Sequence, residues 1–304
     1  MILIGENMNI MSIKYGKAMK EKDAKVIQEL AVQEQEAGMN YVDLNIGPAG
    51  RIGEELMEWI VKTVQEVVDL PCALDTSNVA AIKAGLKVHK GRALINSISA
   101  REDRMEALLP LAKEFDADFV GLLWGPEGMP RDEHERGALS EVIRSSAAAL
   151  GIPMERIWLD PIVTPVNVQQ NQVMALYTFM TDYYSAGVFE GCTTTCGLSN
   201  VSNGPPEHLR PILNQTYLVM IKRYGMASAI VDVFDTDLHK FARGEHPEIE
   251  QLIYKVCDGE NIDMSSLSKE EADYVKTARV LLGQSLYSLC VIRAAPVMRP
   301  YGRH

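Results

Sequence analysis

The chain has 304 residues, of which 47% are hydrophobic and 23% charged, and its formal net charge is −11. This length and these ordinary globular values allow one large domain with a buried core. The acidic balance argues against nucleic acid as a partner, because phosphate contacts need an excess of Lys and Arg. It argues equally against docking on an anionic membrane surface.

Cysteine usage and the start of the chain favour a cytoplasmic protein. The five cysteines are loosely spaced, which is typical of reduced thiols rather than of a disulfide framework. The segment Met1–Glu6 has neither a basic stretch nor a long apolar run, and no apolar run reaches the roughly 18 residues of a membrane span. We therefore expect no signal peptide, no membrane span and a first core strand at Ile2–Ile4.

Short apolar strands alternate with amphipathic helices along most of the chain. The strands are expected over residues 2–6, 41–45, 72–75, 93–96, 119–123, 157–160, 192–198 and 229–233. The helices are expected over residues 24–37, 54–68, 79–89, 104–115, 133–150, 168–184 and 209–224, with a longer C-terminal set. Eight such units predict an α/β fold of the (β/α)8 TIM-barrel type. The alternative is a doubly wound open sheet, but Gly5–Asn9 lacks the Gly-rich phosphate loop which that fold would need.

Residues 244–275 depart from this alternation, with nine acidic residues against two basic ones. A helix is expected from Pro247 to Val256, and a second helix should begin at Ser268, where Ser268–Glu271 fits a capping box. We interpret residues 244–270 as an acidic helical insertion in a single domain of residues 1–304. A solvated surface is favoured over a docking or oligomer contact, because charge runs are mostly solvated.

The carboxyl ends of the predicted strands carry many polar side chains, and a TIM barrel forms its active site there. None of these side chains is a Lys, Arg or His. They are Glu6, Asn7, Asn9, Asp43, Asn45, Asp75, Ser77, Asn78, Asn96, Ser97, Asp160, Ser199, Asn200, Ser202, Asn203, Asp232 and Asp235.

This set disfavours several kinds of chemistry. A metal centre would need clustered His ligands, and a Schiff-base enzyme would need a Lys at a strand end. A nucleophilic triad would need a His, and a phosphate substrate would need basic residues or a glycine nest. Carboxylates accept hydrogen bonds from ring and amine N–H groups, whereas amides both donate and accept. We therefore expect an uncharged heterocycle that is rich in N–H donors, and no directly bound metal.

The tract Gly197–Gly204 holds two hydroxyl and two amide side chains between two glycines, with no charge. Such a loop suits a flat, neutral, hydrogen-bonding ligand, and a tight turn rich in Ser and Asn is the alternative. Structural roles are open elsewhere too. Ser77 or Asn78 could cap the next helix, Asn96 and Asp160 could form turns, and Asp43 could be a structural acid inside the barrel.

Six motifs occur in order at six of the eight predicted strand ends, over about residues 1–205. They are Gly5-Glu6-Asn7-x-Asn9, Asp43-Leu44-Asn45-x-Gly47-Pro48, Leu74-Asp75, Ile95-Asn96-Ser97, Asp160-Pro161 and Gly197-Leu198-Ser199-Asn200-Val201-Ser202. Each motif alone is weak, but the ordered set is specific. Together they resemble the methyltetrahydrofolate:corrinoid protein methyltransferases, a family of pterin-binding TIM barrels.

The resemblance implies a set of roles. Asp75, Asn96 and Asp160 would hydrogen-bond the pterin ring, and Asn200 would approach N5, the nitrogen that carries the transferred methyl group. Other residues of the same motifs are predicted to line the pterin site: Glu6, Asn9, Asp43, Asn45, Gly197, Ser199 and Ser202. Tetrahydrofolate or methyltetrahydrofolate would be the substrate. A partner protein would carry the corrinoid (cobalamin-type) cofactor and dock over the barrel mouth, and the chain would form a homodimer.

The expected chemistry is a displacement at carbon, in which the amine leaves well only if N5 gains a proton or a hydrogen bond. The Asn200 amide could donate that hydrogen bond. No side chain of strong general-acid type is evident, so the proton is expected through hydrogen bonds or water.

Two segments depart from the family pattern. Residues 244–275 are longer than expected, and the sequence Ser202–Pro206 differs from the one expected after the last motif. They favour a catabolic O-demethylase-type or methylamine-type system, in which a methylcorrinoid gives its methyl group to tetrahydrofolate. Two alternatives remain. One is a dihydropteroate synthase-like enzyme, which would need basic residues for its pterin diphosphate. The other is a pterin-binding subunit without catalysis.

Overall fold

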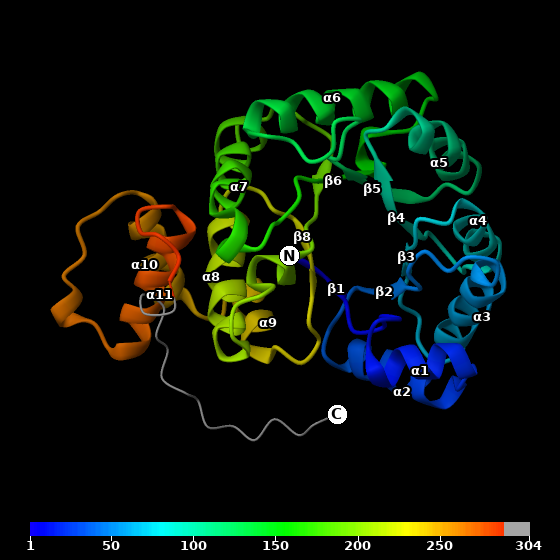
Figure 1. The fold of residues 1–304 in the computed structure, drawn as a ribbon, viewed down its shortest axis with the longest axis horizontal. Coiled ribbons are helices and arrows are strands. Elements are labelled where there is room, and N and C mark those ends of the chain that lie inside the picture. The colour runs from blue at the N-terminus through cyan, green and yellow to red at the C-terminus, as the bar shows by residue number, and fades with distance from the viewer. Residues whose placement is uncertain (289–304) are drawn as a thin grey trace.

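Parallel strands ring the centre of the molecule in a computed structural model that describes residues 1–288 (Figure 1). Within this part of the chain, eight strands pair in the order β7-β6-β5-β4-β3-β2-β1-β8. They are β1 (Ile2–Gly5), β2 (Tyr41–Asn45), β3 (Cys72–Asp75), β4 (Leu94–Ser99), β5 (Asp118–Leu122), β6 (Ile157–Asp160), β7 (Thr193–Thr194) and β8 (Ser228–Val231). The predicted TIM-barrel class is therefore confirmed.

Helices cover the outside of this ring (Figure 1). They are α1 (Ile13–Glu21), α2 (Ala24–Glu36), α3 (Gly53–Gln65), α4 (Val79–Val88), α5 (Glu102–Glu114), α6 (Glu133–Ala149), α7 (Val166–Phe179), α8 (Arg210–Lys222), α9 (Thr236–Arg243), α10 (Pro247–Cys257) and α11 (Lys269–Leu281). No helix within residues 1–288 is long and apolar enough to cross a membrane. Cys72, Cys192, Cys196 and Cys257 are free thiols, and Cys290 lies outside the described residues.

Helix α1 was not predicted from the sequence. Gly16 lies in its interior, where glycine normally weakens a helix. The structure explains that glycine, because a Cβ at position 16 would overlap the carbonyl oxygen of Ile10. Ser12 caps the helix by accepting a hydrogen bond from the Tyr15 amide.

An apolar plug fills the barrel interior. Its buried members come from five strands: Ile4, Ala73, Leu94, Val120 and Trp158. Tyr41 packs on the plug, with its ring in an edge-on contact 5.5 Å from that of Trp158. Because side chains alternate between the two faces of a strand, the inner-face residues two positions further on lie one layer above the plug.

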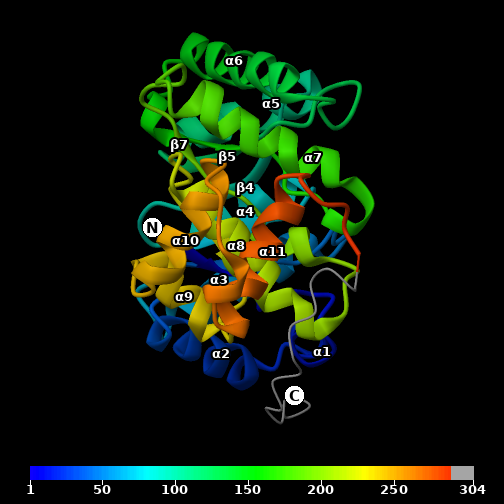
Figure 2. The ribbon, with the colours of Figure 1, turned by 90° about the vertical axis from the view of Figure 1, so that its left-hand side faces the viewer.

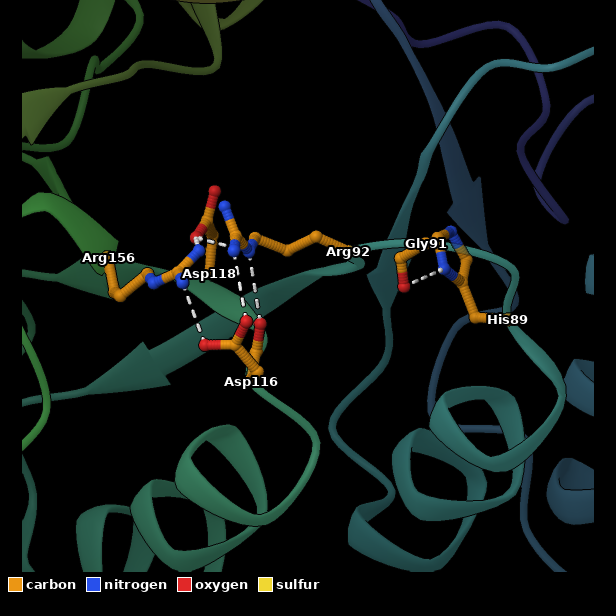
Figure 3. A network of polar contacts seen from close by, with 6 residues as sticks. All are labelled: His89, Gly91, Arg92, Asp116, Asp118 and Arg156. Carbon is orange, nitrogen blue, oxygen red and sulfur yellow. Dashed lines mark hydrogen bonds and ion pairs between the residues drawn. The ribbon is translucent and has the colours of Figure 1, made fainter.

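The amino-terminal edge of the strands is held by ion pairs (Figure 3). Arg156 donates to Asp116 at 2.7 Å and to Asp118 at 3.1 Å, and Arg92 donates to Asp116 at 2.9 Å. These residues join the beginnings of β4, β5 and β6. Charge at this edge therefore contributes to structure, as expected for the face opposite the active site of a TIM barrel.

Strand β7 is much shorter than predicted, so the expected strand over residues 192–198 is wrong beyond Thr194. The chain turns instead into a 3-10 helix at Leu198–Ser202. The seam between β7 and β8 is then closed by a bridge between Gly197 and Ile230. The Thr194 hydroxyl also spans the seam, since it donates to the Gly225 carbonyl at 2.7 Å and accepts from the Ala227 amide at 2.9 Å.

The acidic segment is a pair of helices, α10 and α11, that pack outside α8 (Figures 1 and 2). Buried apolar side chains join both helices to the main core, among them Ile253, Val256, Val275, Ala278 and Leu281. The predicted capping box at Ser268 is confirmed. Glu250 is buried and accepts from Lys222 of α8, with both carboxylate oxygens 3.1 Å from Nζ. The interpretation as a solvated surface is therefore too simple, because this segment is a packed layer over α8.

We predict opposite outcomes for two neighbouring buried threonines. Thr194→Val should lower the free energy of unfolding by about 1–3 kcal/mol, because it removes the hydroxyl that joins the Gly225 carbonyl to the Ala227 amide. Thr195→Val is the matched control and should be neutral or stabilising, since the Thr195 hydroxyl is buried without a hydrogen-bond partner among residues 1–288. Urea unfolding measures both effects. Equal losses in the two variants would show that the hydroxyl does not close the seam.

Candidate active site

The polar side chains at the barrel mouth share one strand register. Each lies two residues after a side chain that belongs to the apolar plug or packs on it. The pairs are Ile4 and Glu6, Tyr41 and Asp43, Ala73 and Asp75, Leu94 and Asn96, and Trp158 and Asp160. Since this spacing keeps a side chain on the same face of a strand, the barrel brings these five predicted residues into one polar layer.

Two carboxylate–amide pairs occupy the side of the layer formed by β2, β3 and β4. Asn45 donates to Asp75, and Asn96 donates to Asp43 at 2.9 Å. Asp43 is only 3% exposed, whereas Asp75 and both amides are partly exposed. Burial raises the pKa of Asp75 to about 6, and burial together with the nearby Asp75 charge raises the pKa of Asp43. Asp75 therefore faces the mouth, and Asp43 supports it from beneath.

Asp160 closes the neighbouring part of the layer. One of its carboxylate oxygens accepts from the Ile162 amide at 2.8 Å, so the turn role left open by the sequence is real. Arg136, fully buried on α6, donates to the Pro161 carbonyl at 2.8 Å. Burial raises the pKa of Asp160 to about 6, and the Arg136 charge opposes that rise.

The turn Leu198–Ser202 forms the opposite wall. Ser199 donates its hydroxyl to Glu6 at 2.8 Å, while Asn200 is exposed beside it. Ser202 is fully buried, and its hydroxyl donates to the Ser199 carbonyl at 3.1 Å. A Cβ on Gly197 would lie 3.0 Å from the Asn200 amide nitrogen, so glycine leaves room for that side chain. Ser199 and Asn200 thus face the mouth, with Ser202 beneath them.

Asn9 and Asn78 are placed by their loops. Asn9 forms a bridge with Asn45 and accepts from the Met11 amide at 2.9 Å, so it lies between the first two strand ends. Asn78 caps α4 by accepting from the amides of Ala80 and Ala81, which confirms its structural alternative. Ser77 is exposed in the same loop.

Comparison with known proteins identifies the family. The model for pterin-binding enzymes matches residues 8–232. The chain belongs to the family of pterin-binding enzymes. A methylcorrinoid:tetrahydrofolate methyltransferase of Eubacterium limosum is 29% identical over 240 residues, which are 78% of this chain and 87% of that protein. The resemblance stated from the motifs is thereby confirmed.

Other proteins match this chain over different shares of their own length. The methionine synthase of Mycobacterium leprae is 26% identical over 239 residues, which are 76% of this chain and 20% of that much longer protein. Among solved structures, the dihydropteroate synthase of Thermus thermophilus has a TM-score of 0.60 at 19% identity, covering 81% of this chain and 93% of that one. At this identity the solved structure shows a shared fold alone.

Arginines reach the mouth of this pterin-binding barrel from the helices. The strand ends themselves carry none, as the sequence indicates, but long side chains extend from α5, α6 and α8. Arg104 donates to the carbonyls of Ser77 at 2.8 Å and Ser97 at 3.4 Å, and Arg210 donates to Ser202 at 3.3 Å. The basic side chains that a phosphate substrate would need therefore lie next to the loops of the mouth, although the strand ends lack them.

Glu34 is a buried acid that the sequence reading missed. It lies on α2 with 0% exposure, and neither carboxylate oxygen has a hydrogen-bond partner in the described part of the chain. Glu34 follows Ile27, Leu30 and Ala31 at helical spacing on the buried face of α2. This spacing was the sequence signal that could have predicted its burial. Burial raises the pKa of Glu34, and the charges of Asp232 and Glu6 raise it further.

Glu34→Gln should stabilise the protein in a pH-dependent way. A carboxyl whose pKa is raised in the folded state lowers stability above its ordinary value of 4.5, because the unfolded chain ionises freely there. We expect a gain of about 1–3 kcal/mol at pH 8 that shrinks as the pH falls toward 4.5. Urea unfolding at several pH values measures it. The exposed Glu36→Gln is the control, and an effect of Glu34→Gln that is constant with pH would contradict the reasoning.

Proposed function

We propose that this pterin-binding enzyme is a methyltransferase. It moves a methyl group between N5 of tetrahydrofolate and the cobalt of a corrinoid that a partner protein carries. The observation that carries the proposal is the polar layer, which sets the acceptors Asp75 and Asp160 at the same barrel mouth as the exposed neutral amide of Asn200. The similarity to a methylcorrinoid:tetrahydrofolate methyltransferase over most of both chains supports it.

The two sides of the layer suit the two parts of the reaction. The carboxylates accept from the ring and amine N–H groups of a pterin and hold it in one orientation. Asn96, oriented by its bond to Asp43, adds a polar amide on the same side. Asn200 then hydrogen-bonds N5 without bringing a charge. As N5 becomes an ammonium, the amide oxygen of Asn200 accepts from its N–H, which stabilises the positive charge that develops at that nitrogen. Glu6, Asn9, Asn45, Gly197, Ser199 and Ser202 complete or support the proposed pterin site.

A partner surface is available around the mouth. Large apolar side chains are exposed on the loops and first helical turns that follow the strands: Met11, Ile13, Ile52, Trp124, Val168 and Phe234. Exposed apolar side chains gathered around a polar site are typical of a protein-binding surface. They support a corrinoid protein that docks over the mouth and brings its cobalt to the pterin. The proposed assembly also includes a homodimer of this chain.

The proposed direction is methyl transfer from the corrinoid to tetrahydrofolate. The name of the Eubacterium limosum relative places the methylcorrinoid first and tetrahydrofolate second. An O-demethylase-type or methylamine-type system would use the reaction in this direction to form methyltetrahydrofolate.

The direct test is to incubate the purified protein with methylcob(III)alamin and tetrahydrofolate. Loss of the methylcobalamin spectrum with matching formation of methyltetrahydrofolate supports the proposal. Tight pterin binding without transfer would favour a non-catalytic subunit. Formation of dihydropteroate from a pterin diphosphate and 4-aminobenzoate would instead favour a synthase, a reaction in which Arg104 could bind the diphosphate.

Asn200→Ala should lose turnover far more than affinity. We expect kcat to fall about 100-fold, in line with removal of one hydrogen-bond partner at a developing charge, while the Kd for tetrahydrofolate changes less than threefold. Stopped-flow spectra and calorimetry give the two quantities. Asn203→Ala, an exposed amide in the same loop, is the control. Equal losses of rate and affinity would show that Asn200 only binds the pterin.

A further inference from the structure

We propose that Glu6 is the proton acceptor for N5 when tetrahydrofolate is methylated, and the proton donor in the reverse reaction, with the Ser199 hydroxyl as the relay. This inference rests on the proposed function and deepens it. It supplies a proton-exchanging side chain where the sequence alone showed none.

The geometry connects Glu6 to the proposed position of N5. Ser199 precedes Asn200 in the turn, and its hydroxyl donates to Oε1 of Glu6 at 2.8 Å. Both Glu6 and Ser199 are partly exposed at the mouth, so a bound pterin can reach the hydroxyl. A hydroxyl both donates and accepts, whereas the amide of Asn200 holds its protons tightly. The path from N5 therefore runs through Ser199.

The surroundings of Glu6 place its proton equilibrium near neutral pH. Three charged groups face it: Asp232 after β8, Glu34 on α2 and Arg210 on α8. Burial and the Asp232 charge raise the pKa of Glu6 to about 7, against the lowering effects of the Ser199 hydrogen bond and Arg210. A group with a pKa near the working pH can both accept and return a proton.

The other acids of the layer are less well placed for this exchange. Asp160 accepts from the Ile162 amide, and Asp75 accepts from Asn45. Both of these carboxylates are proposed to accept from N–H groups of the pterin. Glu34 is fully buried, so no ligand reaches it. Glu6 alone among these four acids is bonded to the residue next to Asn200.

Methyl transfer forms one bond at N5 and breaks one bond at cobalt. The N5 lone pair forms a bond to the methyl carbon while the cobalt–carbon bond breaks. The bonding pair stays on cobalt, which is reduced from Co(III) to Co(I). N5 then carries both the methyl group and a proton, as an ammonium. That proton passes to the Ser199 oxygen as the Ser199 proton passes to Glu6, which leaves neutral methyltetrahydrofolate.

Glu6→Gln tests the proposal, because glutamine keeps the size and the acceptor for Ser199 but takes no proton. We expect kcat to fall at least 100-fold with an unchanged Kd for tetrahydrofolate, and the inflection near pH 7 to disappear from the pH–rate profile. Asp232→Asn should move that inflection to lower pH, since it removes a negative charge that faces Glu6. A Glu6→Gln variant with the wild-type rate and pH profile would overturn the proposal.

A second measurement does not depend on turnover. The infrared band of a protonated carboxyl should titrate near pH 7 in the wild type, and this part of the signal should be missing in Glu6→Gln. No such difference between the two proteins would overturn the role of Glu6, even if methyl transfer is observed. Conversely, a wild type that transfers no methyl group refutes the proposed function, while the titration still reports whether Glu6 holds a proton at neutral pH.

Discussion

The apolar plug inside the barrel is the feature on which the rest of the structure depends. Trp158, Tyr41 and their neighbours pack inside the barrel beneath the mouth, so the mouth has an apolar floor. The next inward-facing residues along the strands are carboxylates and amides. They therefore lie on an apolar layer, where hydrogen bonds and charge–charge interactions are stronger than in water. Residues two positions apart on a strand face the same way, so the same alternation places both the apolar plug and the polar layer above it.

Ionising the buried carboxyl groups of this layer costs free energy, and binding of a ligand would offset that cost. Burial raises the pKa of Glu6, Asp75 and Asp160 to between about 6 and 7, which means that the fold does not favour their ionised forms. A ligand that donates several N–H groups supplies the partners that the ionised forms lack. A bound ligand of this kind would therefore stabilise the ionised carboxylates. Carboxyl groups with perturbed pKa values are common at functional sites.

Much of this arrangement could be predicted from local sequence. The strands over 41–45, 72–75 and 157–160 match the observed ones, because each is a short apolar run that ends in an acid or amide. The capping box at Ser268 was also predictable, since it depends on residues only three positions apart. The polar layer followed from knowing that parallel strands end at one edge.

The remainder depends on contacts between distant residues. The Thr194 hydroxyl holds the short strand β7 beside the start of β8 through bonds to Gly225 and Ala227, which no local pattern reveals. Arg104 and Arg210 enter the mouth by the length of their side chains, from helices that were predicted correctly. The packing of α10 and α11 on α8 was hidden because the acids of the segment dominated its composition.

A crystal structure with tetrahydrofolate bound tests the proposed site most directly. We expect the pterin ring to lie in the polar layer, with its N–H groups on Asp75 and Asp160. N5 should then lie within about 3 Å of the Asn200 side chain. A pterin bound elsewhere, or one whose N5 points away from Asn200, would contradict it.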